Sequence, residues 1–293
     1  MESHERAWAA GFFDGEGWAN RSERGVHSRI NQAGLDGVPE VLTKFHRIVG
    51  VGRLKGPVIA EGRQPLYFWE ATSRHDLLQV VERIGPWLCP VKRAEFERTL
   101  AGPLPAQVWP GSMSEELAWA GGFFDGEGST YLEKHRTHAR YFVPRLHVTQ
   151  SAWGGVAPEL IRFKAAMGGK GSISGASKNK RDGKPYRRWR AYTDDEVQLG
   201  LHLLLPFIGE VKRLQATTAM QGYPLTGRVP RGNPAFGVAG ARYCLRGHDK
   251  WNARLRPFRG RGKNTEDPMN HFRQCLSCVR EDARARRTKK RRP

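Results

Sequence analysis

The sequence predicts an α+β protein that consists of two pseudo-symmetric αββαββα units followed by a short basic tail. Three observations lead to this fold class. A nine-residue run at 9–17, AAGFFDGEG, recurs at 120–128 as AGGFFDGEG. Three further matches follow in the same order, separated by 118 to 120 residues, and chance does not easily order matches in this way. The composition then changes sharply after residue 227.

The elements of the unit are clearest in the second copy. Ser112 and Glu115 form a capping-box pattern ahead of the repeated helix. Alternation near the end of 141–150 predicts a half-buried strand, and a proline close to the start of 156–164 is typical of the first turn of a helix. The remaining elements are a glycine-rich approach at 169–174, a hairpin with a basic loop at 177–184, a return strand at 187–192 and a closing helix at 194–205.

Length, cysteine content and charge limit the possible functions. The chain has 293 residues, of which 39% are hydrophobic, so it can form one large or two ordinary domains. Its formal charge of +20 excludes an acidic solubilising protein and favours a polyanionic partner. No apolar run is long enough to span a membrane, and four cysteines do not make a disulfide framework, so we expect a cytoplasmic protein.

The charge is concentrated behind a predicted linker. Residues from Arg228 onward hold 19 of the 49 Lys and Arg residues but five of the 29 acids, which gives this region +14 of the total. Prolines and glycines after residue 100 and after residue 221 mark the boundaries. The predicted domains are a first unit at 1–100, a linker at 101–111, a second unit at 112–221, a linker at 222–240, a zinc-binding, DNA-contacting module at 241–283 and a basic disordered tail at 284–293.

The repeated run predicts that the two units pack through their motif helices. Glycine in a helix interior costs about 0.5–1 kcal/mol relative to alanine, so Gly11 and Gly122 indicate a close approach between two helices. The paired phenylalanines would then face the core of their own unit. Gly17 and Gly128 are expected to cap the helix C-termini.

This arrangement places two acids at one junction. Glu16 and Glu127 would lie at helix C-termini, where the helix dipole disfavours a carboxylate and the two side chains repel each other. Such a pair would have raised pKa values unless a hard divalent cation lies between them. We therefore expect a Mg²⁺ or Mn²⁺ site that can polarise a phosphodiester and activate water. Asp14 and Asp125 are expected to make hydrogen bonds at the helix ends.

The doubled run resembles the LAGLIDADG signature of homing endonucleases in their single-chain form with two motifs. The resemblance covers roughly residues 5–220, with Phe-Phe in place of Leu-Ile and Glu in place of the commoner Asp. It implies that Glu16 and Glu127 are the catalytic, metal-binding acids and that each unit carries an antiparallel sheet that binds the DNA major groove. It also implies that Gln32 and Gln150 help to order water and that Lys92 and Lys212, before the last helices, support the transition state.

DNA contacts are expected from basic residues of the strands and hairpins. Arginine can bind guanine edges with two hydrogen bonds, and lysine mainly supplies phosphate contacts. The candidates are Arg21, Arg24, Arg29, Arg53, Lys55, Arg63, Arg136, Arg140, Arg145, Lys178, Lys180, Arg181, Lys184, Arg187, Arg188 and Arg190. Because the copies differ so much outside the motif, the target should be asymmetric.

The tail has the ligand spacing of a zinc site. Cys244 and His248 form a C-x₃-H pair, and Cys275 and Cys278 form a C-x₂-C pair, which suits tetrahedral Zn²⁺. His271 is an alternative to His248 as the fourth ligand. A short segment poor in aliphatic residues needs such a metal to fold. The tail also resembles zinc-knuckle modules found beside phage and bacterial nucleases, which implies an auxiliary role in DNA binding.

These features together predict a Mg²⁺-dependent, site-specific double-strand DNA endonuclease. It would be a functional monomer with internal pseudo-twofold symmetry, encoded by a bacterium or phage and acting on the nucleoid or on phage DNA. Whether the gene is free-standing or encoded in an intron, for intron homing, stays open. The alternative is a non-cleaving nucleic-acid binder on the same scaffold, such as an intron maturase or a transcription regulator. Retention of both glutamates argues against it, because a pure binder gains nothing from two repelling carboxylates.

Overall fold

The computed structural model describes residues 2–23, 25–35, 37–61, 64–108, 111–134, 142–151, 154–179, 183–226, 254–257 and 271–274. The chain forms two compact units. The first comprises residues 1–130 and 145–215, and the second comprises residues 131–144 and 216–293. The first unit contains the first copy of the repeat and most of the second, which are called the first half and the second half below.

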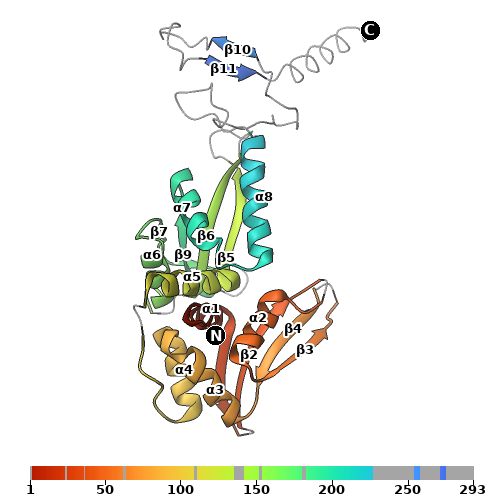
Figure 1. The fold of residues 1–293 in the computed structure, drawn as a ribbon, viewed down its shortest axis with the longest axis vertical. Helices are drawn as coiled ribbons and strands as arrows, with labels where there is room; N and C mark the ends of the chain where they lie inside the picture. The colour runs from red at the N-terminus through yellow and green to blue at the C-terminus, as the bar shows by residue number, and fades with distance from the viewer. Residues whose placement is uncertain are drawn as a thin grey trace. The chain divides into compact units, whose positions relative to one another are not determined.

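The first half is an antiparallel sheet covered by helices (Figure 1). Its strand order is β1-β2-β4-β3. Ile30 of β2 pairs with Trp69 of β4, and both side chains are fully buried against the helices. The elements in chain order are α1 (Ser3–Glu16), β1 (Gly17–Ser22), β2 (Gly25–Ala33), α2 (Glu40–Val49), β3 (Arg53–Val58), β4 (Leu66–Ala71), α3 (Arg74–Ile84), the 3₁₀ turn η1 (Gly85–Trp87) and α4 (Pro90–Leu100).

The second half repeats this order with a broken second hairpin. Its strand order is β5-β6-β9-β7, and β8 also pairs with β9. Val148 pairs with Trp189 as Ile30 pairs with Trp69, which confirms the internal repeat in three dimensions. The elements in chain order are α5 (Met113–Glu127), β5 (Gly128–Lys134), β6 (Phe142–Ser151), α6 (Pro158–Ala166), β7 (Ser172–Ile173), β8 (Ser177–Lys178), β9 (Pro185–Ala191), α7 (Asp194–Leu204) and α8 (Glu210–Thr226).

The fold class is the predicted one, and each half adds one element to it. The order αββαββα is present in both halves, and a further helix follows, α4 in the first half and α8 in the second. Lys92 and Lys212 therefore lie in the first turns of these added helices, not before the last helix as expected. Helix α8 also continues to Thr226, past residue 222 where the linker was predicted to begin. Its Pro224 does not end the helix, although Pro lacks the amide hydrogen that an interior position uses.

Helices α1 and α5 lie side by side between the two halves, as Figure 1 shows. A Cβ added to Gly11 would overlap the Trp119 carbonyl and lie 2.9 Å from the Phe123 backbone nitrogen. A Cβ added to Gly122 would overlap the Trp8 carbonyl in the reciprocal way. The glycines therefore have the predicted purpose, because only a residue without a side chain allows these two backbones to touch.

The paired phenylalanines fill the core of their own half, as predicted. Phe13 stacks on Phe96 with ring centroids 5.1 Å apart, and Phe124 stacks on Phe163 at 6.4 Å. Gly17 follows α1 with an extended backbone (φ −82°), so it does not use the left-handed conformation typical of a glycine cap. A side chain there would collide with the Phe13 ring, with its Cβ 2.6 Å from Cε2. Packing, not backbone conformation, therefore explains the glycine after the motif.

The described part of the second unit beyond α8 is a short hairpin. Strands β10 (Arg254–Pro257) and β11 (His271–Gln274) pair antiparallel, with Arg254 opposite Gln274. The predicted zinc ligands Cys244, His248, Cys275 and Cys278 lie outside the described residues. Within the described ranges, the helices are too short or too polar to cross a bilayer.

Candidate active site and nucleic-acid-binding face

The motif aspartates join the two halves. Asp14 Oδ2 accepts a hydrogen bond from Trp119 Nε1 of the other half at 2.8 Å, and Asp125 Oδ2 accepts one from Trp8 Nε1 at 2.9 Å. Each aspartate also accepts from a backbone N–H at the start of a following helix, Asp14 from Cys89 and Asp125 from Gly209. The expected helix-end hydrogen bonds thus exist, and they reach across the junction and to α4 and α8.

Glu16 and Glu127 are the last residues of α1 and α5. The Glu16 Cγ lies 3.0 Å from the position of a Cβ on Gly126, and the Glu127 Cγ lies 3.2 Å from that of a Cβ on Gly15. Each glutamate therefore packs against the glycine that precedes the other glutamate. The structure brings the two acids together at the junction, as the repeat predicted.

The environment of this pair opposes two negative charges. Burial and, next in size, the neighbouring charge of Glu16 together raise the pKa of Glu127 from 4.5 to about 8. Burial also raises the pKa of Glu16, although a hydrogen bond from Gln32 and the charge of Lys212 partly offset it. Two carboxylates that repel each other in a buried setting form an oxygen donor set that suits a hard divalent cation. The residues present therefore fit the metal that the motif implies.

The two predicted glutamines and the two predicted lysines contact the acids to different extents. Gln32 bonds to Glu16, whereas the Gln150 Oε1 accepts from the Ser151 N–H at 2.8 Å. Lys212 Nζ donates to the carbonyl of Gly128, directly after Glu127, at 2.6 Å. Lys92 Nζ instead donates to Glu95 Oε1 at 3.0 Å. The second half thus presents its lysine at the acids more directly than the first half does.

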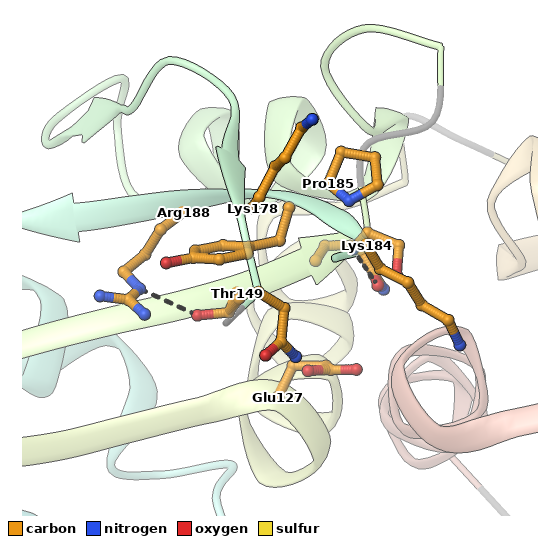
Figure 2. A pocket seen from close by; sticks show the side chains of 10 residues that line it. Glu127, Thr149, Lys178, Lys184, Pro185 and Arg188 are labelled. Carbon is orange, nitrogen blue, oxygen red and sulfur yellow. Dashed lines mark hydrogen bonds between the residues drawn. The ribbon is translucent and has the colours of Figure 1, made fainter. Parts of the chain in front are cut away.

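A cavity of about 650 Å³ opens beside Glu127 on the second half. Strands β6, β8 and β9 contribute most of its wall. Figure 2 shows Glu127 at one end of this pocket, Lys178 extending away from it, and Arg188 bonded to Thr149 along one side. The lining residues are Glu127, Thr149, Gln150, Ser151, Lys178, Asn179, Lys184, Pro185, Tyr186 and Arg188. The acid therefore adjoins a cationic surface large enough for a phosphate group.

The sheet face opposite the helices differs between the halves. In the first half, Glu70 pairs with Lys55 and lies 3.7 Å from His27 Nε2, so an acid partly neutralises the basic residues there. Arg29 lies over the Phe68 ring at 3.6 Å, and exposed Arg53 shares this face. In the second half, the positions matching Phe68 and Glu70 are Arg188 and Arg190. The second sheet therefore carries arginines where the first carries an aromatic ring and an acid.

Two predicted DNA-contacting arginines lie on the helix-covered side of their strands. Arg21 lies two residues from buried Ala19, on the same face of β1, and donates to the Thr99 carbonyl of α4. Arg187 lies two residues from buried Trp189, on the same face of β9, and donates to the Gly155 and Ser174 carbonyls. The strand alternation places both away from the open face. Arg145, with its Nη1 bonded to the Tyr192 carbonyl, is on the open face with Arg188 and Arg190. Arg24, Arg63, Arg136, Arg140, Lys180 and Arg181 lie outside the described residues.

Sequence reasoning missed two cations that cross the junction, one buried and one half-buried. Arg162 of α6 is 1% exposed, forms a two-point ion pair with Glu116 at 2.9 and 3.0 Å, and donates to the Trp87 carbonyl of the first half at 2.5 Å. Lys44 of α2 occupies the matching position and donates to the Phe207 carbonyl at 3.5 Å. Their equivalence across the repeat, at a separation of 118, was the available signal.

Comparison with solved structures identifies this arrangement as the two-motif LAGLIDADG fold. The meganuclease I-CpaMI bound to uncleaved DNA superimposes with a TM-score of 0.53 at 12% identity, covering 75% of this chain and 91% of that chain. The LAGLIDADG meganuclease I-AabMI bound to uncleaved DNA gives 0.52 at 15% identity, covering 75% and 90%. No family model and no curated protein sequence matches the chain. At these identities the likeness establishes the fold.

Proposed function

We propose that this protein is a site-specific endonuclease that uses a divalent cation to cleave both strands of a long, asymmetric DNA target. The observation that carries the proposal is the pair of glutamates at the ends of α1 and α5, held together by the glycines of the opposite helix. A buried pair of repelling carboxylates is costly to a protein that only binds DNA. The likeness to meganucleases bound to DNA supports the same conclusion.

The site residues divide the chemical work between them. Glu16 and Glu127 would hold the divalent cation, which when bound supplies positive charge that neutralises the carboxylates and stabilises charge developing on the phosphate. The Lys212 ammonium is placed beside both acids and adds positive charge where a scissile phosphate would lie. Gln32 retains a second amide hydrogen beyond its bond to Glu16, with which it can orient a water molecule.

The basic sheet faces would bind the DNA backbone and bases. Arg188 is held in place by Thr149, and Arg190 lies over the Tyr192 ring at 5.4 Å, so both guanidinium groups are oriented before DNA arrives. Such preorganised arginines favour two-point contacts with guanine edges or phosphates. The different side chains at matching positions of the two sheets support an asymmetric target.

The decisive experiment selects a cleavable target and then removes one acid at a time. The full chain is incubated with a randomised duplex library and Mg²⁺, and the cleaved ends are sequenced. On the recovered duplex, Glu16→Gln and Glu127→Gln should each abolish cleavage of one strand while DNA binding stays equal or becomes tighter. Exposed Glu82→Gln, which removes the same charge from α3, is the matched control and should cleave as the parent does.

The result also separates the alternative function. A parent protein that binds selected DNA or RNA with high affinity but leaves every duplex intact with Mg²⁺ and Mn²⁺ would favour the non-cleaving binder. Equal nicking by the parent and both glutamine variants would contradict the assignment of Glu16 and Glu127 as the catalytic acids.

We also propose that residues 241–283 form a zinc-binding module that adds DNA contacts. The proposal rests on the spacing of Cys244, His248, Cys275 and Cys278. The β10–β11 register supports His248 over His271. Arg254, which follows Cys244 and His248 in the sequence, pairs with Gln274, which directly precedes Cys275, whereas His271 pairs with Pro257 at the other end of the hairpin.

A further inference from the structure

The two lysines of the candidate site have unequal surroundings. Lys92 Nζ donates to Glu95 Oε1 at 3.0 Å, one turn further along α4, and the pair is only 15% and 20% exposed. Glu95 is itself fixed, because its second oxygen, Oε2, lies 3.4 Å from the backbone N–H of Ala19 in β1. Glu159, a buried residue of α6, adds a second negative charge near Lys92.

The repeat gives Lys212 no counterpart of these two acids. The repeat places Gln215 at the position of Glu95, at a separation of 120, and Val41 at the position of Glu159, at a separation of 118. Lys212 accordingly donates to the Gly128 carbonyl and interacts with the charges of Glu16, Glu127 and Asp125. The two lysines therefore differ both in the residues at matching positions and in the hydrogen bonds that they make.

An acid paired with a lysine cancels much of the positive charge that the lysine offers to a phosphate. Both lysines interact with Glu127, but the charge of Lys92 is neutralised by Glu95, to which its ammonium donates. Lys212 instead donates to the uncharged Gly128 carbonyl and also interacts with Glu16. Since positive charge near the scissile phosphate stabilises the transition state, the half that contains Lys92 should hydrolyse its phosphodiester more slowly.

We propose that Glu95 is a positioning residue that makes the two strand cleavages sequential: the phosphodiester beside Lys212 is hydrolysed first, and the one beside Lys92 follows. This inference rests on the proposed endonuclease function and adds an order to it. Glu95 acts through Lys92, so its removal should change one strand rate and leave the other as it was.

The test measures the two strands separately. The duplex recovered from the library selection is labelled on one strand or the other, and single-turnover cleavage by the full chain is followed with Mg²⁺. The parent should accumulate nicked DNA, cut on one strand only. Glu95→Gln retains an oxygen that accepts from Ala19 but removes the charge, and it should raise the slow strand rate about threefold to tenfold, equivalent to roughly 0.7–1.4 kcal/mol.

Three further variants make the result specific. Lys92→Met should slow only the slow strand and Lys212→Met only the fast strand, which assigns each lysine to its phosphodiester. Gln215→Glu, at an exposed position, should slow the fast strand by giving Lys212 the partner that Lys92 has. Glu97→Gln removes the same charge from α4 without touching the pair and should leave the ratio of strand rates at the parent value.

The outcomes separate this inference from the function on which it rests. Equal strand rates in the parent, or an unchanged ratio in Glu95→Gln, would overturn the inference while leaving the endonuclease assignment intact. A parent that cleaves no duplex would overturn the function itself. If Glu95→Gln does not fold, Glu95→Asp and Gln215→Glu decide: the first retains the charge and should retain the parent ratio, and the second should reduce it.

Discussion

The contact between α1 and α5 predicts a large effect of a single methyl group. In Gly122→Ala, the new Cβ would overlap the Trp8 carbonyl oxygen and lie 2.8 Å from the Phe12 backbone nitrogen. An ordinary contact of this kind is 3.4–4 Å, so the helices must separate by at least 0.6 Å, and by more to clear the oxygen. Overpacking of this kind costs about 1–3 kcal/mol.

The same movement stretches the hydrogen bonds that cross the junction. Trp8 donates to Asp125 and Trp119 donates to Asp14, both at less than 3 Å and both buried. A hydrogen bond to a charged group contributes about 1.5–3 kcal/mol. With one such bond weakened, Gly122→Ala should lower the free energy of unfolding by about 2–5 kcal/mol, which is measurable by urea denaturation followed through tryptophan fluorescence.

A control at a loop glycine tests whether the effect belongs to the junction. Gly154→Ala meets nothing within 4 Å and should unfold within about 0.5 kcal/mol of the parent. Gly122→Ala should also lose cleavage under conditions where it remains folded, because Glu16 and Glu127 move with their helices. An alanine variant as stable as the parent would refute the close approach of the two backbones.

Three other changes have defined outcomes. Burial and the charge of Glu16 raise the pKa of Glu127 from 4.5 to about 8. Between these pH values the folded state therefore holds a proton that the unfolded state has lost, and the metal-free protein should lose stability as the pH rises from 4.5 to 8. Urea denaturation in EDTA should show this fall, Mg²⁺ should reverse it, and a fall of the same size in Glu127→Gln would contradict it. Arg188→Gln should weaken DNA binding, and if Arg188 contacts a phosphate, the slope of log affinity against log salt concentration should become smaller by roughly 0.9. Arg21→Gln, on the other face of the sheet, should bind as the parent does. Equal affinities of the parent and both variants in a salt titration would remove Arg188 from the interface. A strong chelator should release one Zn²⁺ per chain, detected by a colorimetric dye, and a metal-free purified protein would rule out the zinc module.

The sequence predicted the elements that local patterns encode. The capping box at Ser112 and Glu115 is present in full, and the repeated glycines identified the helix pair that touches. The position of Glu16 and Glu127 at helix ends followed from the glycine after each. Each of these inferences needs only neighbouring residues or one comparison between the copies.

The rest depended on contacts between distant residues. Nothing within one copy reveals that Trp119 would donate to Asp14 of the other copy, because partner choice follows from how the helices dock. The pairing of Lys92 with Glu95 depends on β1, which holds the second oxygen of Glu95. For Arg21 and Arg187, however, the sequence held the answer. Each lies two residues from an apolar residue, Ala19 or Trp189, that is buried under the helices, so it shares the face of that residue and not the open face.

The exchange of tryptophan and aspartate partners has a consequence for how such a chain can arise and be divided. The indole N–H of Trp8 and that of Trp119 each bond to an aspartate of the opposite copy. A fragment ending near residue 105 would have to find a second copy of itself, which carries the complementary aspartate, or associate with the missing fragment. Co-expressed fragments split in the 101–111 segment should therefore reassemble, and each alone should be either a homodimer or insoluble.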